Sequence, residues 1–133
     1  MIYLLDTNIC IGYINRRNPA IYQYFLSVSP DDVFIYDVVK FELYYGAYKS
    51  SRTIENLEIL DNFFADLISL SFEAKAAQIC GQIRAKLQTK GTPIGAYDLQ
   101  IAAIALANNL ILVTHNTKEF ERIESLTLED WQL

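Results

Sequence analysis

Short apolar runs alternate along the chain with longer segments in which apolar residues recur every three or four positions. The short runs are typical of buried strands, and the longer segments are typical of amphipathic helices. We expect strands at residues 2–5, 33–36, 67–70, 110–113 and 126–128. We expect helices at residues 7–14, 38–46, 54–64, 72–88, 96–107 and 117–122, and another that begins at 18–19. This alternation predicts an α/β protein whose mostly parallel sheet carries helices on both faces.

Capping and turn residues mark several boundaries between these elements. Asn18 and Pro19 open the second helix, and Asp37 is expected to cap the third. Residues 90–93, Lys-Gly-Thr-Pro, are expected to end the long helix because glycine and proline interrupt helical geometry.

Length and composition are those of a soluble globular protein. The 133 residues suit one domain, residues 1–133, and 52% hydrophobic against 20% charged residues excludes disorder as the main state. The apolar run at 1–5 is too short for a secretion signal, and that at 101–107 falls far short of the roughly 20 residues that span a bilayer. We therefore expect a cytoplasmic protein with no membrane contact. Cys10 and Cys80 form neither a metal-ligand pair nor a disulfide framework, and both are interpreted as small core residues.

The charge distribution says more about function than the net charge does. A net charge of −5 is unusual for a general nucleic-acid binder. Residues 75–90, however, carry four bases and no acid: Lys75, Arg84, Lys86 and Lys90. This basic segment either contacts phosphates or forms a solvated helix face, and the sequence leaves both interpretations open.

Acidic and amide side chains stand beside apolar, core-like residues in four short stretches. These stretches contain Asp6, Glu42, Asp98, and the pair Asn116 and Glu119. A carboxylate against a hydrophobic core is costly unless a cation neutralises it, and no Lys or Arg stands within three residues of Asp6 or Asp98. Several such acids together indicate a cage for a divalent metal.

The expected topology brings most of these residues to one edge of the sheet. In parallel α/β sheets the working site lies beyond the carboxyl ends of the strands. Asp6 follows the first strand, Glu42 lies in the second turn of the helix after the second strand, and Asn116 follows the strand before the last helix. Asp98 reaches that edge only if the loop at residues 89–95 returns the chain there.

Each of these residues also has a simpler structural role. Asp6 taken alone is more simply a cap of the first helix, Asn116 is a candidate cap, and Glu119 is a first-turn acid favoured by the helix dipole. Glu42 and Asp98 are harder to explain in this way because both share the apolar stripe of their helices. These structural roles account for each residue taken alone. They account poorly for the presence of all of these residues in one protein.

The donor types indicate which metal and which chemistry to expect. Carboxylate and amide oxygens suit Mg²⁺ or Mn²⁺, whereas zinc prefers His or Cys, and His115 is the only histidine. Phosphodiester hydrolysis uses such a cage because the metal lowers the pKa of a bound water and polarises the phosphoryl oxygen. Thr7 and Thr114 are candidates to hydrogen-bond the ligating carboxylates.

Other sites known on α/β folds do not match this sequence. A phosphoacceptor receiver domain needs an acidic pair after the first strand, and a haloacid-dehalogenase-type phosphatase needs a second Asp where Asn8 stands. The five glycines are isolated, so no Gly-rich phosphate loop exists. A Ser or Cys nucleophile is not supported either, because the one histidine lies in an expected loop.

The motifs together resemble a known family. Those motifs are Leu-Asp-Thr-Asn at 5–8, Phe-Glu-Leu-Tyr-Tyr-Gly at 41–46, Gly-Thr-Pro-Ile-Gly-Ala-Tyr-Asp-Leu-Gln-Ile-Ala at 91–102, Val-Thr-His-Asn-Thr-Lys-Glu-Phe at 113–120 and Leu-Glu-Asp-Trp at 128–131. In this order they resemble the PIN-domain ribonuclease toxins called VapC, over nearly the whole chain. The resemblance implies a three-layer α/β/α sandwich and an RNA endonuclease that depends on Mg²⁺ or Mn²⁺. It also implies a homodimer and an antitoxin partner, VapB, whose arm covers the active-site groove.

The resemblance also implies roles for individual residues. Asp6, Glu42 and Asp98 match the family's three main acidic positions. Asn116 stands where many PIN domains carry an Asp, so the fourth position belongs either to Asn116 or to Glu119. The Gly-Thr-Pro-Ile-Gly stretch is similar to the branch that cuts initiator tRNA in the anticodon loop and so inhibits translation.

Three hypotheses follow from the sequence. The first is a metal-dependent RNA endonuclease toxin in which Arg84, Lys86 and Lys90 contact phosphates. The second is a PIN-like module that binds nucleic acid or protein without catalysis, and the third is a nuclease of the same fold that acts on DNA. An aromatic cluster at Tyr44, Tyr45 and Tyr48 serves a dimer contact, an antitoxin contact or plain helix packing.

Overall fold

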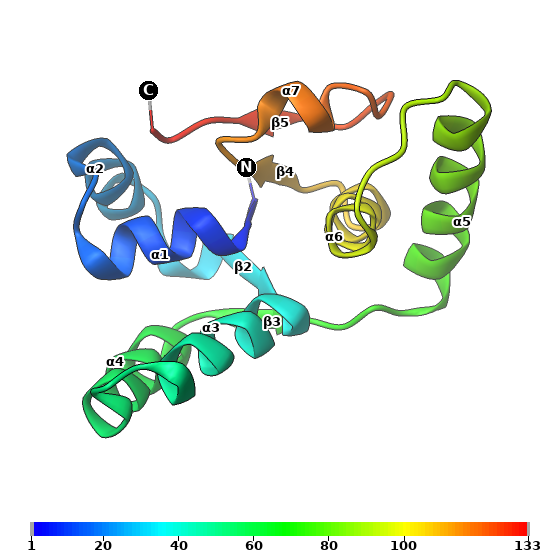
Figure 1. The fold of residues 1–133 in the computed structure, drawn as a ribbon. Coiled ribbons are helices and arrows are strands. Elements are labelled where there is room, and N and C mark those ends of the chain that lie inside the picture. Colours follow the sequence, from blue (N-terminus) through cyan, green and yellow to red (C-terminus); the bar gives the residue numbers. More distant parts are fainter. Residues whose placement is uncertain (1, 133) are drawn as a thin grey trace.

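A computed structural model of the protein describes residues 2–132 and contains a five-stranded sheet in which every neighbouring pair of strands is parallel (Figure 1). The strands are β1 (Tyr3–Leu5), β2 (Val33–Tyr36), β3 (Ile68–Leu70), β4 (Ile111–Val113) and β5 (Leu128–Glu129). Their order, β3-β2-β1-β4-β5, places β1 at the centre, between β2 and β4. The predicted strands are confirmed, although the last one begins two residues later than expected.

Helices connect the strands and cover both faces of the sheet. They are α1 (Thr7–Asn15), α2 (Pro19–Ser27), α3 (Asp37–Lys49), α4 (Thr53–Ala65), α5 (Ala74–Thr89), α6 (Ala96–Ala107) and α7 (Thr117–Phe120), with a short 3₁₀ turn at Pro30–Asp32. In Figure 1, α1 and α2 lie on one side of the sheet and α5 and α6 on the other, which confirms the three-layer α/β/α sandwich. No helix within residues 2–132 has the length and apolar character that crossing a membrane requires.

The core lies between strands β1 and β4 and the helices packed on them. Leu4 and Leu5 of β1 and Leu112 and Val113 of β4 are fully buried. Residues 101–105 of α6 are buried as well. A helix that is apolar all round belongs in the interior, and strands covered on both faces have continuous apolar sequences. These two facts explain why both kinds of element were recognisable from their sequences.

Asp37 does not cap α3, contrary to the prediction. Tyr36 occupies the capping position, and Asp37 is the first residue of the helix. The Asp37 carboxylate accepts hydrogen bonds from the hydroxyls of Ser69 and Ser71, the second at 3.2 Å. Because β3 pairs with β2 in the sheet, its end brings these distant donors to Asp37.

The two cysteines differ in burial. Cys10 on α1 is fully buried, as predicted. Cys80 on α5 is only half-buried, so its interpretation as a core residue is wrong in part. It lies on the outer part of the sandwich, where it packs against the edge of the core.

Candidate active site

A small cavity lies at the carboxyl ends of β1 and β2. Its lining comes from the strand ends and from the starts of α1, α3 and α6: Asp6, Thr7, Asn8, Tyr36, Val38, Val39, Glu42, Tyr97, Asp98 and Ile101. The three principal acids predicted from the sequence therefore share one cavity, although 92 positions separate the first from the last. We call this the acidic cavity. The loop at residues 89–95 does return the chain to this edge, as the placement of Asp98 requires.

Asp6 has the capping role as well as a place in the acidic cavity. Its backbone N–H donates to the carbonyl oxygen of Val113 at 3.1 Å, which ties the end of β1 to β4. Its Oδ1 atom accepts from the N–H of Ile9 at 3.0 Å and so caps α1. The two interpretations of Asp6 are therefore compatible, because one carboxylate oxygen caps the helix while the side chain lines the cavity.

Glu42 is held in place by the residue that follows Asp6. The Oγ1 hydroxyl of Thr7 donates to Oε1 of Glu42 at 2.8 Å. This bond joins the first turn of α1 to α3 and restricts the rotation of a long, otherwise flexible side chain. The sequence predicted that Thr7 bonds a carboxylate of the site, and the contact is present.

Burial and neighbouring acids raise the pKa of Asp6 and of Asp98. Burial is the main cause that raises the pKa of Asp98 to about 6, followed by the charge and hydrogen bonding of Glu119 and the charges of Asp6 and Glu42. Burial also raises the pKa of Asp6, and the charge of Glu42 adds to the rise. A hydrogen bond from Thr114 and the N–H of Ile9 oppose it. Carboxylates that share a poorly hydrated site without a cation behave in this way, and such sites are frequently functional.

Of the two candidates in the fourth stretch, Glu119 interacts with Asp98 directly, whereas Asn116 interacts with Glu119. Asn116 is exposed, and its Nδ2 amide donates to Oε2 of Glu119 at 3.1 Å. Glu119 is close enough to Asp98 to raise its pKa both by charge and by hydrogen bonding. Asn116 stands at the capping position of α7 but makes no capping side-chain bond, so that part of the prediction is wrong. Its N–H is instead bonded to the hydroxyl of the fully buried Thr114 at 3.0 Å.

The donor set suits a hard divalent cation, although the side chains do not form a closed cage. The ion pairs within residues 2–132 join none of these acids to a Lys or Arg. No three or more His, Cys, Asp or Glu side chains of that range are already arranged to hold a metal ion. The site thus combines oxygen donors with uncompensated negative charge, the composition that Mg²⁺ and Mn²⁺ sites require.

Comparisons with known proteins identify the family. The PIN domain family profile matches residues 3–126. Over 129 residues the chain is 40% identical to the tRNA(fMet)-specific endonuclease VapC of Shigella flexneri, with 97% of each chain covered. It is 42% identical over 132 residues to Ribonuclease VapC2 of Rickettsia felis, with 98% of each covered. The chain belongs to the VapC family of PIN-domain ribonucleases.

Solved VapC structures share the fold closely. The chain in the VapBC2 complex of Rickettsia felis with a promoter DNA fragment has a TM-score of 0.90 and 41% identity, covering 98% of this chain and 99% of that one. DNA-bound VapBC from Salmonella typhimurium gives a TM-score of 0.91 and 40% identity, with 98% of each chain covered. The neighbours are thus VapC chains solved together with VapB.

The basic residues predicted to contact phosphates lie outside the acidic cavity. Arg84 and Lys86 are exposed on α5, and Lys90 is exposed at the residue that follows it. Arg84 lines a neighbouring hollow beside the start of α6. Lys86 and Lys90 line another hollow together with Arg122, and the Nζ atom of Lys90 is 3.9 Å from an oxygen of Glu124. Phosphate contact by these residues stays a prediction, and it would involve RNA beyond the cavity.

Sequence reasoning missed three polar residues near the acids. Asn8 and Tyr97 line the acidic cavity, and the hydroxyl of Tyr36 bonds the side chain of Gln100. Asn8 and Tyr97 stand within two positions of Asp6 and Asp98, so their proximity in sequence was the available signal. No local sequence pattern predicts the contact between Tyr36 and Gln100, because 64 positions separate them.

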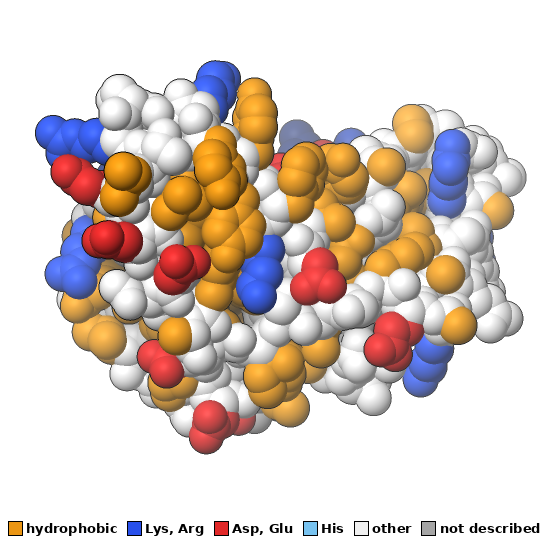
Figure 2. Space-filling model, turned by 90° about the horizontal axis from the view of Figure 1, so that it is seen from below, with side chains coloured by type: hydrophobic (Ala, Val, Ile, Leu, Met, Phe, Trp, Pro, Cys, Tyr) orange, Lys and Arg blue, Asp and Glu red, His pale blue; other side chains and the backbone are white. Residues whose placement is uncertain are grey.

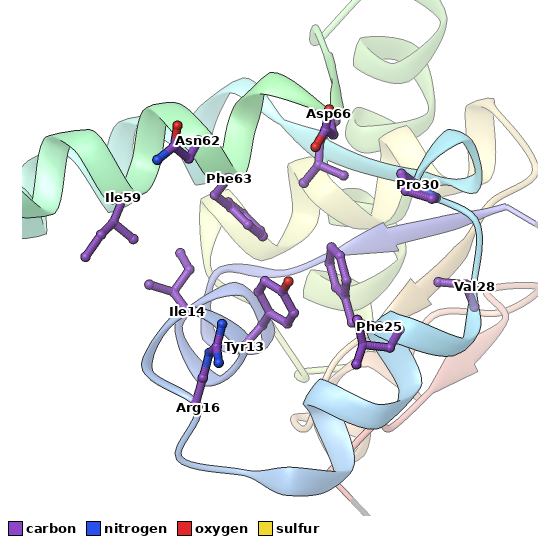
Figure 3. A pocket seen from close by; sticks show the side chains of 12 residues that line it. Tyr13, Ile14, Arg16, Phe25, Val28, Pro30, Ile59, Asn62, Phe63 and Asp66 are labelled. Carbon is purple, nitrogen blue, oxygen red and sulfur yellow. The ribbon is translucent and has the colours of Figure 1, made fainter.

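A second, larger hollow lies between α1, α2 and α4 (Figure 3). Its volume is about 480 Å³ against about 140 Å³ for the acidic cavity. Figure 3 shows the rings of Tyr13, Phe25 and Phe63 pointing toward one another, and the first two stack with centroids 4.0 Å apart. Arg16 and Asp66 are its only charged lining residues among those described. The acids predicted from the sequence line the smaller cavity, and none of them lines this aromatic groove.

Proposed function

We propose that the chain is a metal-dependent RNA endonuclease that acts as the toxin of a toxin–antitoxin pair. The observation that carries the proposal is the convergence of Asp6, Glu42 and Asp98 in one cavity, where the pKa of Asp98 is raised to about 6. The names of the relatives support it, since the Shigella flexneri protein is called a tRNA(fMet)-specific endonuclease and the Rickettsia felis protein a ribonuclease.

In this proposal Asp6, Glu42 and Asp98 hold Mg²⁺ or Mn²⁺, and Glu119 completes the set with Asn116 hydrogen-bonded to it. When bound, the ion supplies an activated water and charge stabilisation at the phosphoryl group. The chain's own residues fix the oxygens: Thr7 orients Glu42, and Thr114 with the N–H of Ile9 orients Asp6. A cation in the cavity would lower the raised pKa of Asp98 and so favour its charged, metal-binding form.

We infer that the substrate is a tRNA, with initiator tRNA cut in its anticodon loop and translation inhibited as the result. The Gly-Thr-Pro-Ile-Gly stretch at 91–95 and 40% identity to a protein named for tRNA(fMet) support this choice. Arg84 and Lys86 on α5 and Lys90 just after it precede that stretch and would bind phosphates of the RNA that lie outside the acidic cavity. Arg122 joins them, since its Nη1 atom donates to the carbonyl oxygen of Pro93 at 3.3 Å.

The partners in this proposal are a VapB-type antitoxin and a second copy of the chain, both in the cytoplasm. Solved neighbours from Rickettsia felis, Salmonella typhimurium and Haemophilus influenzae are VapBC complexes, which supports the antitoxin. A short reading frame that overlaps the start of this gene and encodes a protein that co-purifies with the chain would test it. Sedimentation of the free chain would test the homodimer.

The deciding experiment compares cutting of total RNA and of single-stranded DNA by antitoxin-free protein, with Mg²⁺, Mn²⁺ or EDTA. Asp6→Asn and Asp98→Asn should lose cutting, whereas Glu58→Gln, which changes an exposed acid on α4 outside the cavity, should not. Cutting in EDTA, or full activity of both site variants, would overturn the metal site. Cutting of DNA alone would favour the DNA nuclease, and no cutting by well-folded protein would favour the non-catalytic module. Mapping the new RNA ends identifies the substrate.

A further inference from the structure

Two half-exposed aromatic rings lie beside the acidic cavity, one of which lines it while the other contacts the first. Phe41 directly precedes Glu42, and Tyr97 directly precedes Asp98. Their exposed fractions are 54% and 51%, and Tyr97 itself lines the cavity. The ring centroids are 6.3 Å apart at 72°, an edge-to-face contact that orients one ring against the other. A rigid, solvent-facing aromatic pair therefore borders the acids.

The surface beside this pair mixes aromatic and basic side chains. Tyr45 and Tyr48 follow Phe41 at positions i+4 and i+7 of α3, and both are exposed. The Nζ atom of Lys49 lies 5.7 Å from the ring centroid of Tyr45, whereas that of Lys40 lies 5.1 Å from the ring centroid of Phe64. Figure 2 shows hydrophobic side chains gathered over the face formed by α3 and α4, with both acidic and basic side chains among them. Surfaces that bind single-stranded nucleic acid combine aromatic rings, which stack on bases, with cations, which bind phosphates.

We propose that Phe41 and Tyr97 form a stacking platform for an unpaired RNA base next to the phosphodiester bond that is cut. This inference rests on the proposed function, which makes RNA the substrate. Bases in loops are accessible on their flat faces, and aromatic side chains bind those faces without regard to sequence. A base held on the platform places the adjoining phosphate over the acidic cavity, because Tyr97 belongs to both. Single-stranded RNA is thereby preferred to a duplex, whose bases are already stacked.

The test measures binding in EDTA, where metal-dependent cutting is stopped. The probe is a short single-stranded RNA that contains 2-aminopurine, a base whose fluorescence falls when it stacks on an aromatic ring. The wild-type chain and Tyr97→Phe should quench it. Tyr97→Leu and Phe41→Leu should lose the quenching and bind about 5- to 100-fold more weakly, the range expected for one base–aromatic contact.

Tyr48→Leu is the matched control, because Tyr48 is equally aromatic and exposed on α3 but does not line the acidic cavity. It should bind as the wild type does. The platform is overturned if Tyr48→Leu weakens binding as much as Tyr97→Leu, or if Tyr97→Leu keeps the quenching. It is also overturned if Phe41→Leu or Tyr97→Leu changes the sedimentation mass, since the pair would then belong to a contact between two copies.

These experiments test the platform independently of the proposed endonuclease activity. A wild-type chain that cuts RNA, with variants that bind normally, disproves the platform alone. A wild-type chain that quenches the probe in a Tyr97-dependent way but cuts no RNA disproves the endonuclease and supports the platform. Circular dichroism of each variant confirms that a loss of binding does not come from unfolding.

Discussion

The Thr7 hydroxyl donates a 2.8 Å hydrogen bond to Oε1 of Glu42 across a sequence separation of 35 residues. It is the one direct side-chain bond between α1 and an acid of the cavity on another helix among the described residues. The bond orients Glu42 toward the cavity that Asp6 and Asp98 share. A neutral hydroxyl that holds a carboxylate in this way leaves its negative charge available to a cation.

Thr7→Val, which removes this hydroxyl without changing the shape of the side chain, should weaken metal-dependent cutting by about 10- to 100-fold. Thr7→Ser keeps the donor and should retain most of the activity. Titration of cutting with Mg²⁺ should show that Thr7→Val needs more metal for half-maximal rate. Equal activities of the Val and Ser variants would mean that Glu42 is positioned by other contacts.

Asp6→Asn and Asp6→Ala should differ in their effects on stability, because Asp6 both caps α1 and adds negative charge to the cavity. Asn keeps a capping oxygen and removes repulsion, so the melting temperature in EDTA should stay unchanged or rise while cutting is lost. Ala loses the cap, at a cost of about 0.5–2 kcal/mol in the free energy of unfolding. A drop of several degrees for Asp6→Asn would mean that the negative charge itself stabilises the fold.

Asp98 should make the metal-free chain less stable as pH rises from about 4 to about 6. Its pKa rises from 3.8 to about 6 on folding, so within this window the folded chain binds the proton and the unfolded chain does not. Stability is therefore greatest below the window and lowest above it. In EDTA, Asp98→Asn should melt at a higher temperature than wild type at pH 7.5, and the difference should vanish near pH 4. A difference independent of pH would exclude ionisation of Asp98 as its cause.

Mg²⁺ or Mn²⁺ should raise the melting temperature of the wild-type chain, because a ligand that binds only the folded state stabilises it. The gain is about 2.7 kcal/mol when the ion concentration is 100 times Kd. Asp98→Asn and Asp6→Asn should show much smaller shifts, whereas Glu58→Gln should respond as wild type does. An equal shift in all four chains would place the metal-dependent stabilisation outside the acidic cavity.

Glu119→Gln should reduce cutting more than Asn116→Ala. Glu119 acts on Asp98 directly, whereas Asn116 reaches the group through its 3.1 Å bond to Glu119. Single-turnover rates at saturating Mg²⁺ would separate the two variants. The opposite ranking would assign the fourth position to Asn116.

The sequence by itself determined the elements of the fold, because their signals are local. Hydrophobic periodicity marked the strands and helices, and the Lys-Gly-Thr-Pro stretch marked the end of α5, where Gly91 has a φ of +71° that glycine adopts without strain. The apolar surroundings of Asp6, Glu42 and Asp98 were also visible along the chain, as were the motifs of the family.

Only the tertiary structure decided which side chains meet. The strand order β3-β2-β1-β4-β5 carries Ser69 of β3 and Ser71 just after it to Asp37, which therefore does not act as a cap. The packing of α6 brings Asp98 to Asp6 and Glu119, and it sets Phe41 against Tyr97. Caps and periodicity depend on residues a few positions apart, so a sequence reveals them. Contacts between residues dozens of positions apart depend on how the whole sheet is assembled, and no local pattern encodes that.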